Sequence, residues 1–151
     1  MAYYSIFPEK DSTIYSHPDR EKLNTGGDEI LEVVKEKGTS DQRYYPSRVL
    51  IQFKSEEIKE IITDKMVQTD GTVVGPTHFG LSSTTALNNA VNVCLELFTA
   101  QHKNLANVIN LEVHPISQSW HEGSGRFSNL PTSSNGCSWI FRDNDITGTK
   151  W

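Results

Sequence analysis

The sequence predicts an all-β protein, an antiparallel β-sandwich with one short helix and one long irregular connection. Residues 47–53 form the clearest strand, because β-branched and aromatic side chains alternate there as they do on a half-buried sheet. Several other short apolar runs are separated by turn-forming residues, which is typical of sandwiches. The helix is a two-turn pattern at residues 55–62. We interpret the other segments as elements that pack around the strand at 47–53.

Length and composition narrow the class of protein. The 151 residues are about the size of one domain, and the 36% of apolar residues gather in short runs, so a folded chain with a small core is expected. The net charge of −5 comes from interspersed charges without a basic stripe, which argues against nucleic acid as a partner. No apolar run approaches the ~18 residues of a membrane span, and no secretory signal pattern is present. We therefore expect a cytoplasmic chain unless it leaves the cell within an assembly.

The N-terminal third is predicted to contain short strands joined by polar turns. The strand segments are residues 3–7 (an edge strand or an extended arm), 11–15 and 29–34. A turn is expected at Glu9-Lys10, a polar loop at residues 17–28, and a charged connection at residues 35–41, because these stretches hold charged, Gly and Asx residues.

The central strand has two unlike faces. Val49, Ile51 and Phe53 share one face, and Leu50 lies with Arg48 and Gln52 on the other. Pro46 is expected at the start of this strand, because proline cannot donate a ladder hydrogen bond. We expect the Arg48 guanidinium to meet a carboxylate or a loop carbonyl at a sheet end, since an unpaired buried charge is strongly disfavoured.

The helix and the segments after it complete the predicted fold. Ser55 is the expected N-cap of the helix at 55–62, with Glu56 and Glu57 in its first turn. Residues 63–86 are expected to form a long irregular connection, with 72–74 as a candidate strand inside it. The remaining predicted elements are a hairpin of residues 91–98 and 108–116 with the loop 99–106, and closing strands within 136–141 and 147–151.

Motifs for chemistry are sparse. Adjacent His121 and Glu122 could in principle serve acid–base work, but neighbours on a strand point to opposite faces, so a surface or ligand-contact role is preferred. Asp143 and Asp145 flank Asn144, where a solvated turn is preferred over weak calcium binding. No phosphate loop, nucleophile elbow or spaced histidine set occurs. We predict no catalytic residue, no metal ligand and no cofactor.

Tryptophans and cysteines leave alternatives open. Trp120, Trp139 and Trp151 either fill the core near one end of the sandwich or stack on sugars. The first reading is preferred because each tryptophan follows a turn. Cys94 and Cys137 are expected to be buried free thiols, with a disulfide as the alternative. Trp120, His121 and Glu122 are the candidate contacts with a ligand or partner.

Short motifs along the chain are recognisable as an ordered set. They are Asp11-Ser12-Thr13-Ile14, Asn24-Thr25-Gly26, Ile30-Leu31-Glu32-Val33, Arg48-Val49-Leu50-Ile51-Gln52-Phe53, Trp120-His121-Glu122-Gly123, Gly136-Cys137-Ser138-Trp139 and Gly148-Thr149-Lys150-Trp151. The set resembles the DNRLRE-type jelly-roll domain, a non-catalytic β-sandwich related to carbohydrate-binding modules and found in surface proteins and in virion proteins of tailed phages. The resemblance covers most of the chain except residues 63–86.

The resemblance implies a fold and a function. It implies a jelly-roll β-sandwich over residues 1–151 and a bacteriophage structural protein, a tail, neck or fibre component whose N-terminal sandwich docks onto the particle. Its implied location is the virion, after synthesis in the host cytoplasm, and its implied partners are other virion proteins in a homo-oligomer, ring or fibre. The alternative function is a carbohydrate-binding module that contacts host-surface glycans.

This chain departs from the family pattern in two respects. Gln52 and Lys54 flank Phe53 where the family commonly has arginine and aspartate. The further strands that follow the last tryptophan in the family have no counterpart after Trp151. We therefore expect the chain to be the N-terminal, incomplete part of a longer polypeptide, or a neighbouring subunit to complete its sheet.

Overall fold

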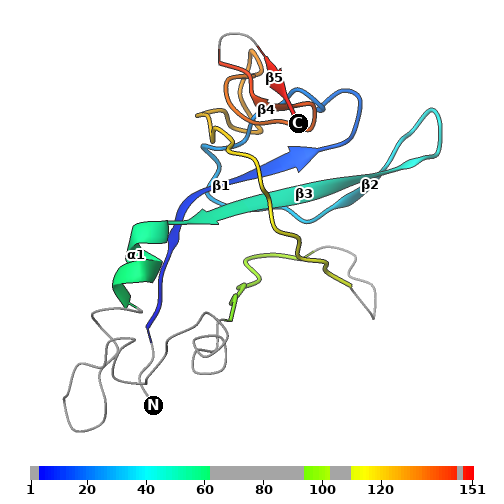
Figure 1. Ribbon diagram of the computed structural model, residues 1–151. Coiled ribbons are helices and arrows are strands. Elements are labelled where there is room, and N and C mark those ends of the chain that lie inside the picture. Colours follow the sequence, from blue (N-terminus) through cyan, green and yellow to red (C-terminus); the bar gives the residue numbers. More distant parts are fainter. Residues whose placement is uncertain (1–3, 62–93, 103–109, 146–147) are drawn as a thin grey trace, which may run out of the picture. The chain divides into compact units, whose positions relative to one another are not determined.

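The computed structural model describes residues 4–61, 94–102, 110–145 and 148–151 (Figure 1). The chain divides into two compact units. The β unit comprises Glu9–Gln52 and His102–Trp151, and the helical unit comprises Met1–Pro8 and Phe53–Gln101. The described secondary structure is five strands and one short helix, with antiparallel pairing, so the predicted all-β class is confirmed.

A three-stranded sheet organises the β unit. Its strands are β1 (Pro8–Tyr15), β2 (Lys35–Lys37) and β3 (Tyr44–Phe53), in the order β1-β3-β2 (Figure 1). The predicted strand at 47–53 is confirmed, but β3 begins three residues earlier. Pro46 therefore lies inside β3, opposite Lys35, and the prediction that it starts the strand is wrong. Its carbonyl oxygen remains useful, because it accepts hydrogen bonds from the Ser16 amide at 3.2 Å and the Ser16 hydroxyl at 2.7 Å.

The first strand runs through the predicted turn. Glu9 and Lys10 both belong to β1, so the turn prediction is wrong, and residues 4–7 form no strand. The Lys10 ammonium lies 4.5 Å from the centre of the Trp120 ring and donates a hydrogen bond to the Trp120 carbonyl oxygen. A cation over an aromatic face is favourable. The contact with Trp120, which is distant in sequence, therefore stabilises Lys10 within β1 although the local sequence predicts a turn there.

The predicted strand at 29–34 is wrong, and the observed strand, β2, starts at Lys35. Side-chain hydroxyls explain the shift, because they bind the backbone groups that a ladder would use. The Thr13 hydroxyl accepts from the Glu32 amide at 2.9 Å. The Ser47 hydroxyl accepts from the Val34 amide at 2.8 Å and donates to the Glu32 carbonyl oxygen at 2.7 Å.

The predicted hairpin does not form in its described parts. Residues 94–98 and 110–116 are assigned to no strand, and all of them are exposed. An alternating pattern needs a partner edge before it becomes a strand, because an isolated pair is only marginally stable. The other strand residues of the predicted hairpin (91–93 and 108–109), the long connection at 63–86 and its candidate strand at 72–74 lie outside the described residues.

The closing strands form a small second sheet in the β unit. Strand β4 (Phe141–Asp143) pairs antiparallel with β5 (Thr149–Lys150), with a register shift between Phe141 and Asp143. Strand β4 shares only Phe141 with the predicted segment 136–141, whose residues 136–140 form no strand, whereas β5 lies within the predicted segment 147–151. The described residues form two small sheets, one of three strands and one of two. These sheets do not by themselves establish the predicted jelly roll.

The core lies on the Leu50 face of β3. Its buried apolar residues are Ile14, Leu50, Trp120 and Cys137, and Trp139 packs against them. Val49 and Ile51, on the more apolar face, are only half-buried. Arg48 is exposed with its guanidinium 4.5 Å from the centre of the Trp139 ring, so the expected carboxylate or carbonyl partner is replaced by an aromatic face.

The helical unit contains α1 (Ser55–Glu60), which confirms the predicted helix. Its N-cap is Lys54, without a side-chain capping bond, so the prediction of Ser55 as the N-cap is wrong. Glu56 and Glu57 do lie in the first turn, where the helix dipole favours negative charge. Among the described residues, no helix has the length and apolar character needed to span a bilayer.

Candidate functional site

The buried centre of the β unit is a polar network around Asn24. This side chain is fully buried, and its amide nitrogen donates to the carbonyl oxygens of Glu122 at 2.6 Å and Cys137 at 2.9 Å. Its carbonyl oxygen accepts from the amides of Gly125 at 2.8 Å and Gly26 at 3.3 Å. One asparagine thus satisfies backbone groups from three segments, and it holds those segments together.

Side chains also cover the outer edge of β1. The Thr25 hydroxyl accepts from the Thr13 amide at 3.1 Å and donates to the Thr13 carbonyl oxygen at 2.7 Å, as a partner strand would. The Asp11 amide donates to the Glu122 carboxylate at 2.7 Å. Because these backbone groups are satisfied, this stretch of β1 is protected from pairing with another strand.

The three predicted contact residues occupy different environments. Trp120 is 5% exposed and lies in the core, so its ring forms no surface platform. Glu122 is half-buried, and its carboxylate holds β1. His121 is exposed, and its backbone is fixed at both ends: its amide donates to the Arg142 carbonyl oxygen at 2.9 Å, and its carbonyl oxygen accepts from the Cys137 amide at 2.7 Å.

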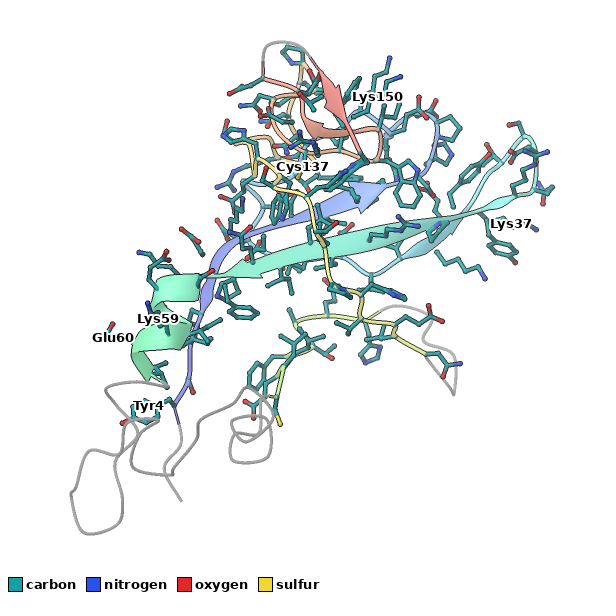
Figure 2. The ribbon with its side chains drawn as sticks, in the orientation of Figure 1. Tyr4, Lys37, Lys59, Glu60, Cys137 and Lys150 are labelled. Atoms are coloured by element: carbon teal, nitrogen blue, oxygen red, sulfur yellow. The ribbon has the colours of Figure 1, made fainter. Side chains whose placement is uncertain are left out.

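Two titratable groups in this network are perturbed. Burial raises the pKa of the Cys137 thiol, which lies among the packed side chains next to β1 (Figure 2), so this cysteine stays a neutral thiol. Burial, reinforced by the nearby Glu122 carboxylate, raises the pKa of Asp11. Both cysteines are free, but Cys94 is exposed, so the expectation of buried thiols is right for Cys137 and wrong for Cys94.

The tryptophans beyond Trp120 are partly accessible. Trp139 is half-buried beneath the Arg48 guanidinium, and Trp151 is 39% exposed with its indole nitrogen donating to the Ser138 carbonyl oxygen at 2.8 Å. Each ring is therefore engaged by a partner within the β unit. Their positions favour a packing role near one end of the unit.

A cluster with metal-ligand chemistry forms where His121 meets the turn after β4. One ligand atom each from His121, Asp143 and Asp145 lies within 4.8 Å of the others. The Asp145 amide donates to the Asp143 carboxylate at 3.1 Å, which shapes the turn. From the sequence, His121 is grouped with its neighbour Glu122, and the two aspartates are a separate motif. Asp143 lies 22 positions after His121, so only the fold brings them together.

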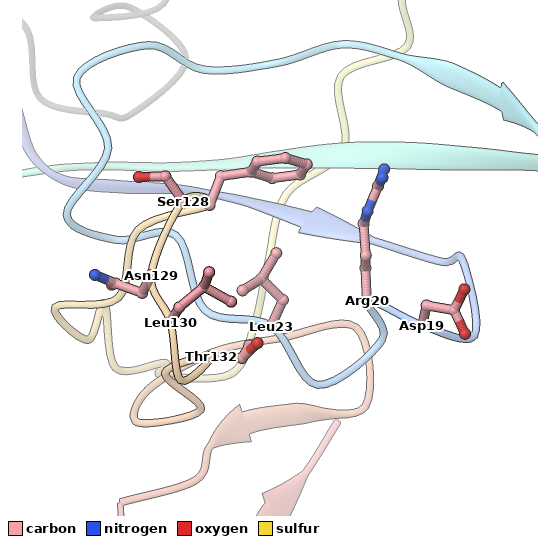
Figure 3. Close-up of a pocket in the computed structure, with 8 residues that line it drawn as sticks. Asp19, Arg20, Leu23, Ser128, Asn129, Leu130 and Thr132 are labelled. Atoms are coloured by element: carbon pink, nitrogen blue, oxygen red, sulfur yellow. The ribbon is translucent and has the colours of Figure 1, made fainter.

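The β unit also contains an open pocket of about 450 Å³ (Figure 3). Its lining residues are Asp19, Arg20, Leu23, Phe127, Ser128, Asn129, Leu130 and Thr132. The Arg20 guanidinium lies 4.9 Å from the centre of the Phe127 ring and forms an ion pair with Glu36 at 2.6 Å. Buried Leu23 lines the pocket, while Asp19 carries a largely exposed carboxylate.

Phe127 gives the pocket an accessible aromatic surface. Phe127 is 43% exposed, and the centre of its ring lies 5.5 Å from that of Tyr15. Its amide donates to the Asp28 carboxylate at 3.0 Å, so the backbone is held in place. Sequence reasoning missed this pocket, because the stretch from Ser128 to Thr132 has only the composition of a loop.

No family model matches the chain, and neither a curated protein nor a solved structure matches it.

Proposed function

We propose that this chain is a non-catalytic structural protein of a phage virion, a tail, neck or fibre component that docks through strand addition at β3. The observation that carries the proposal is the open edge of this strand. Strand β2 pairs only with residues from Tyr44 to Pro46, and in the described part of the chain no strand continues the pairing beside Arg48–Gln52. An unpaired edge of this kind invites a partner strand.

The register defines which backbone groups face the open edge. The Ser47 amide donates to the Val34 carbonyl oxygen on the β2 side, and the Pro46 carbonyl oxygen accepts from Ser16 on the β1 side. Because residues alternate in the direction of their backbone groups, those of Val49 and Ile51 point to the β2 side, past the end of β2. These two residues are the expected docking points for a strand of a neighbouring virion subunit.

Exposed apolar side chains in the same unit support an assembled state. Leu111, Val113 and Ile116 are exposed within one short stretch, and Val113 is 81% exposed. Apolar side chains gathered on a surface commonly mark protein contacts. The resemblance to domains of phage virion proteins supplies the class of assembly.

A proline scan of the open edge tests the proposed docking. Ile51→Pro removes the amide that an added strand would need, while the pairing of β3 with β1 uses the even-numbered residues and is retained. We expect this variant to fold as a free chain but to be absent from purified particles, whereas Ile51→Val is incorporated normally. Incorporation of a folded Ile51→Pro chain at the level of Ile51→Val would contradict the proposal.

Hydrogen exchange provides a second readout that needs no variant. In the free chain, the amides of Val49 and Ile51 should exchange faster than those of Leu50 and Gln52, which face β1. In the particle, the first two amides should become as protected as the second two, because a docked strand accepts their hydrogen bonds. Unchanged fast exchange at Val49 and Ile51 in particles would remove strand addition as the docking mode.

A second candidate function is the binding of host-surface glycans, and the pocket at Phe127 favours it. Sugars present apolar faces and vicinal hydroxyls, which match an aromatic ring flanked by the carboxylate of Asp19 and the amide of Asn129. Trp120 is unsuited to this role, since its ring is buried.

The glycan function is tested by calorimetric titration with host polysaccharide. Phe127→Ala should weaken binding about tenfold, the equivalent of about 1.4 kcal/mol of lost stacking. Phe98→Ala is the matched control, because Phe98 is an exposed ring in the other unit and outside the pocket. Equal affinities of the two variants, or no saturable binding by the parent chain, would exclude this pocket as a glycan site.

A further inference from the structure

We propose that His121, Asp143 and Asp145 bind one divalent transition-metal ion, with zinc as the reference ion. The three ligand atoms come from two segments, the one that follows Trp120 and the one formed by the end of β4 and the turn after it. They lie within 4.8 Å of one another, and zinc bonds of about 2.0–2.2 Å require them to approach by small side-chain rotations. His121 and Asp145 are exposed, so such rotations are unobstructed by the core.

The charges at the cluster favour a cation. In the described residues, neither Asp143 nor Asp145 has an ion-pair partner. The guanidinium of the adjacent Arg142 donates to the Ser119 carbonyl oxygen at 2.8 Å and the Ser119 hydroxyl at 3.3 Å instead of forming an ion pair with either aspartate. Two carboxylates close together without a protein cation form an attractive site for a divalent ion.

The donor set selects the class of metal. Calcium and magnesium prefer oxygen ligands alone, whereas an imidazole with carboxylates suits zinc and its first-row neighbours. Asp143 and Asp145 alone would offer only oxygen ligands, as calcium prefers, and the nearby His121 ring adds a nitrogen ligand that changes the expected ion. Three protein ligands leave a fourth position of a tetrahedral ion open to water or to a group of a partner.

The backbone around the cluster is held in place before any metal binds. His121 is fixed by its two backbone hydrogen bonds to Arg142 and Cys137. Asn144, between the two aspartates, donates from its amide to the Gly136 carbonyl oxygen at 3.1 Å and from its side chain to the Ser134 carbonyl oxygen at 2.9 Å. The ion would therefore bind to a largely formed site, and it would link the His121 segment to the β4 turn.

Metal titration of the full chain tests the site, with Cys94→Ser as the parent because an exposed thiol can itself bind zinc. We expect one zinc ion per chain by calorimetry, a higher Tm in the presence of zinc, and tetrahedral absorption bands with cobalt. His121→Ala and Asp143→Asn should each weaken zinc binding by at least about tenfold, since even the loss of an outer-shell partner of a metal ligand costs about 10–100-fold.

His114→Ala is the matched control. His114 is exposed and lies 3.2 Å from the Glu112 carboxylate, so it is a second histidine–carboxylate pair, and neither residue belongs to the cluster. Its replacement should leave zinc affinity unchanged, and calcium should fail to compete. The site is refuted by any of three results: no saturable zinc binding, equal affinities of His121→Ala and His114→Ala, or calcium binding as tight as zinc binding. Circular dichroism of each variant confirms that the fold is intact before titration.

Discussion

Asn24→Ala is expected to destabilise the chain by about 4 kcal/mol or more, because stranding a buried backbone group costs about 1–3 kcal/mol and this substitution strands several. The carbonyl oxygens of Glu122 and Cys137 and the amides of Gly125 and Gly26 all lose their partner. With a total stability of about 5–15 kcal/mol for an ordinary domain, this loss removes a large fraction of the free energy of unfolding. Urea denaturation followed by circular dichroism measures the loss.

Asn110→Ala is the control for this prediction, since Asn110 is exposed. It should change the free energy of unfolding by less than about 0.5 kcal/mol. Asn24→Asp separates hydrogen bonding from volume: it keeps the size of the side chain but replaces the donating nitrogen by an oxygen that faces two carbonyl oxygens. It should be as damaging as Asn24→Ala. A loss of under about 1 kcal/mol for both Asn24 variants would mean that the network does not hold these segments together.

Gly123→Ala is expected to cost about 3 kcal/mol, the sum of a positive-φ penalty of about 1–2 kcal/mol and an overpacking term of about 1–3 kcal/mol. Gly123 has a φ of +79°, a conformation that L side chains rarely adopt. An added Cβ would also collide with the Asn135 carbonyl oxygen and with the Asn24 side chain. The first obstacle is backbone, and the second is locked into the buried network, so neither can move aside cheaply.

Gly148→Ala isolates the conformational part of this cost. Gly148 has a similar φ of +66°, but its Cβ would meet side-chain atoms of Asn144 and Phe141 at 3.0 Å. It should lose only about 1–2 kcal/mol. Thermal and urea denaturation of both variants provide the comparison. Equal losses at the two positions would show that the close approach of the Gly123 segment to Asn24 has no energetic consequence.

The sequence alone determined the features that depend on local patterns. The all-β class, the strand β3, the helix α1 and the polar loop after β1 follow from side-chain alternation, the helical repeat of isoleucines, and turn-forming residues. Each of these signals is read within a few neighbouring residues, and it does not depend on a partner elsewhere in the chain. The predictions of class and of these elements were confirmed for that reason.

Tertiary structure decided where backbone groups find partners. The hydroxyls of Thr13 and Ser47 accept hydrogen bonds from the amides of residues 32 and 34. The predicted strand at 29–34 therefore does not form, and the observed strand β2 begins after it. The alternating segment at 110–116 finds no edge in the described chain and remains irregular. Propensity could not foresee either outcome, because both depend on which groups the fold brings together.

The candidate sites were also decided by tertiary structure. The sequence marked Trp120, His121 and Glu122 as one group, yet the fold buries the first, uses the third to hold β1, and places the second beside Asp143 and Asp145. The hydrogen bonds that set these positions join residues about a hundred positions apart, such as Asp11 to Glu122 and Asn24 to Gly125. A local pattern holds no information on such pairings, because they form only when the packed chain excludes water from the polar groups that must then satisfy one another.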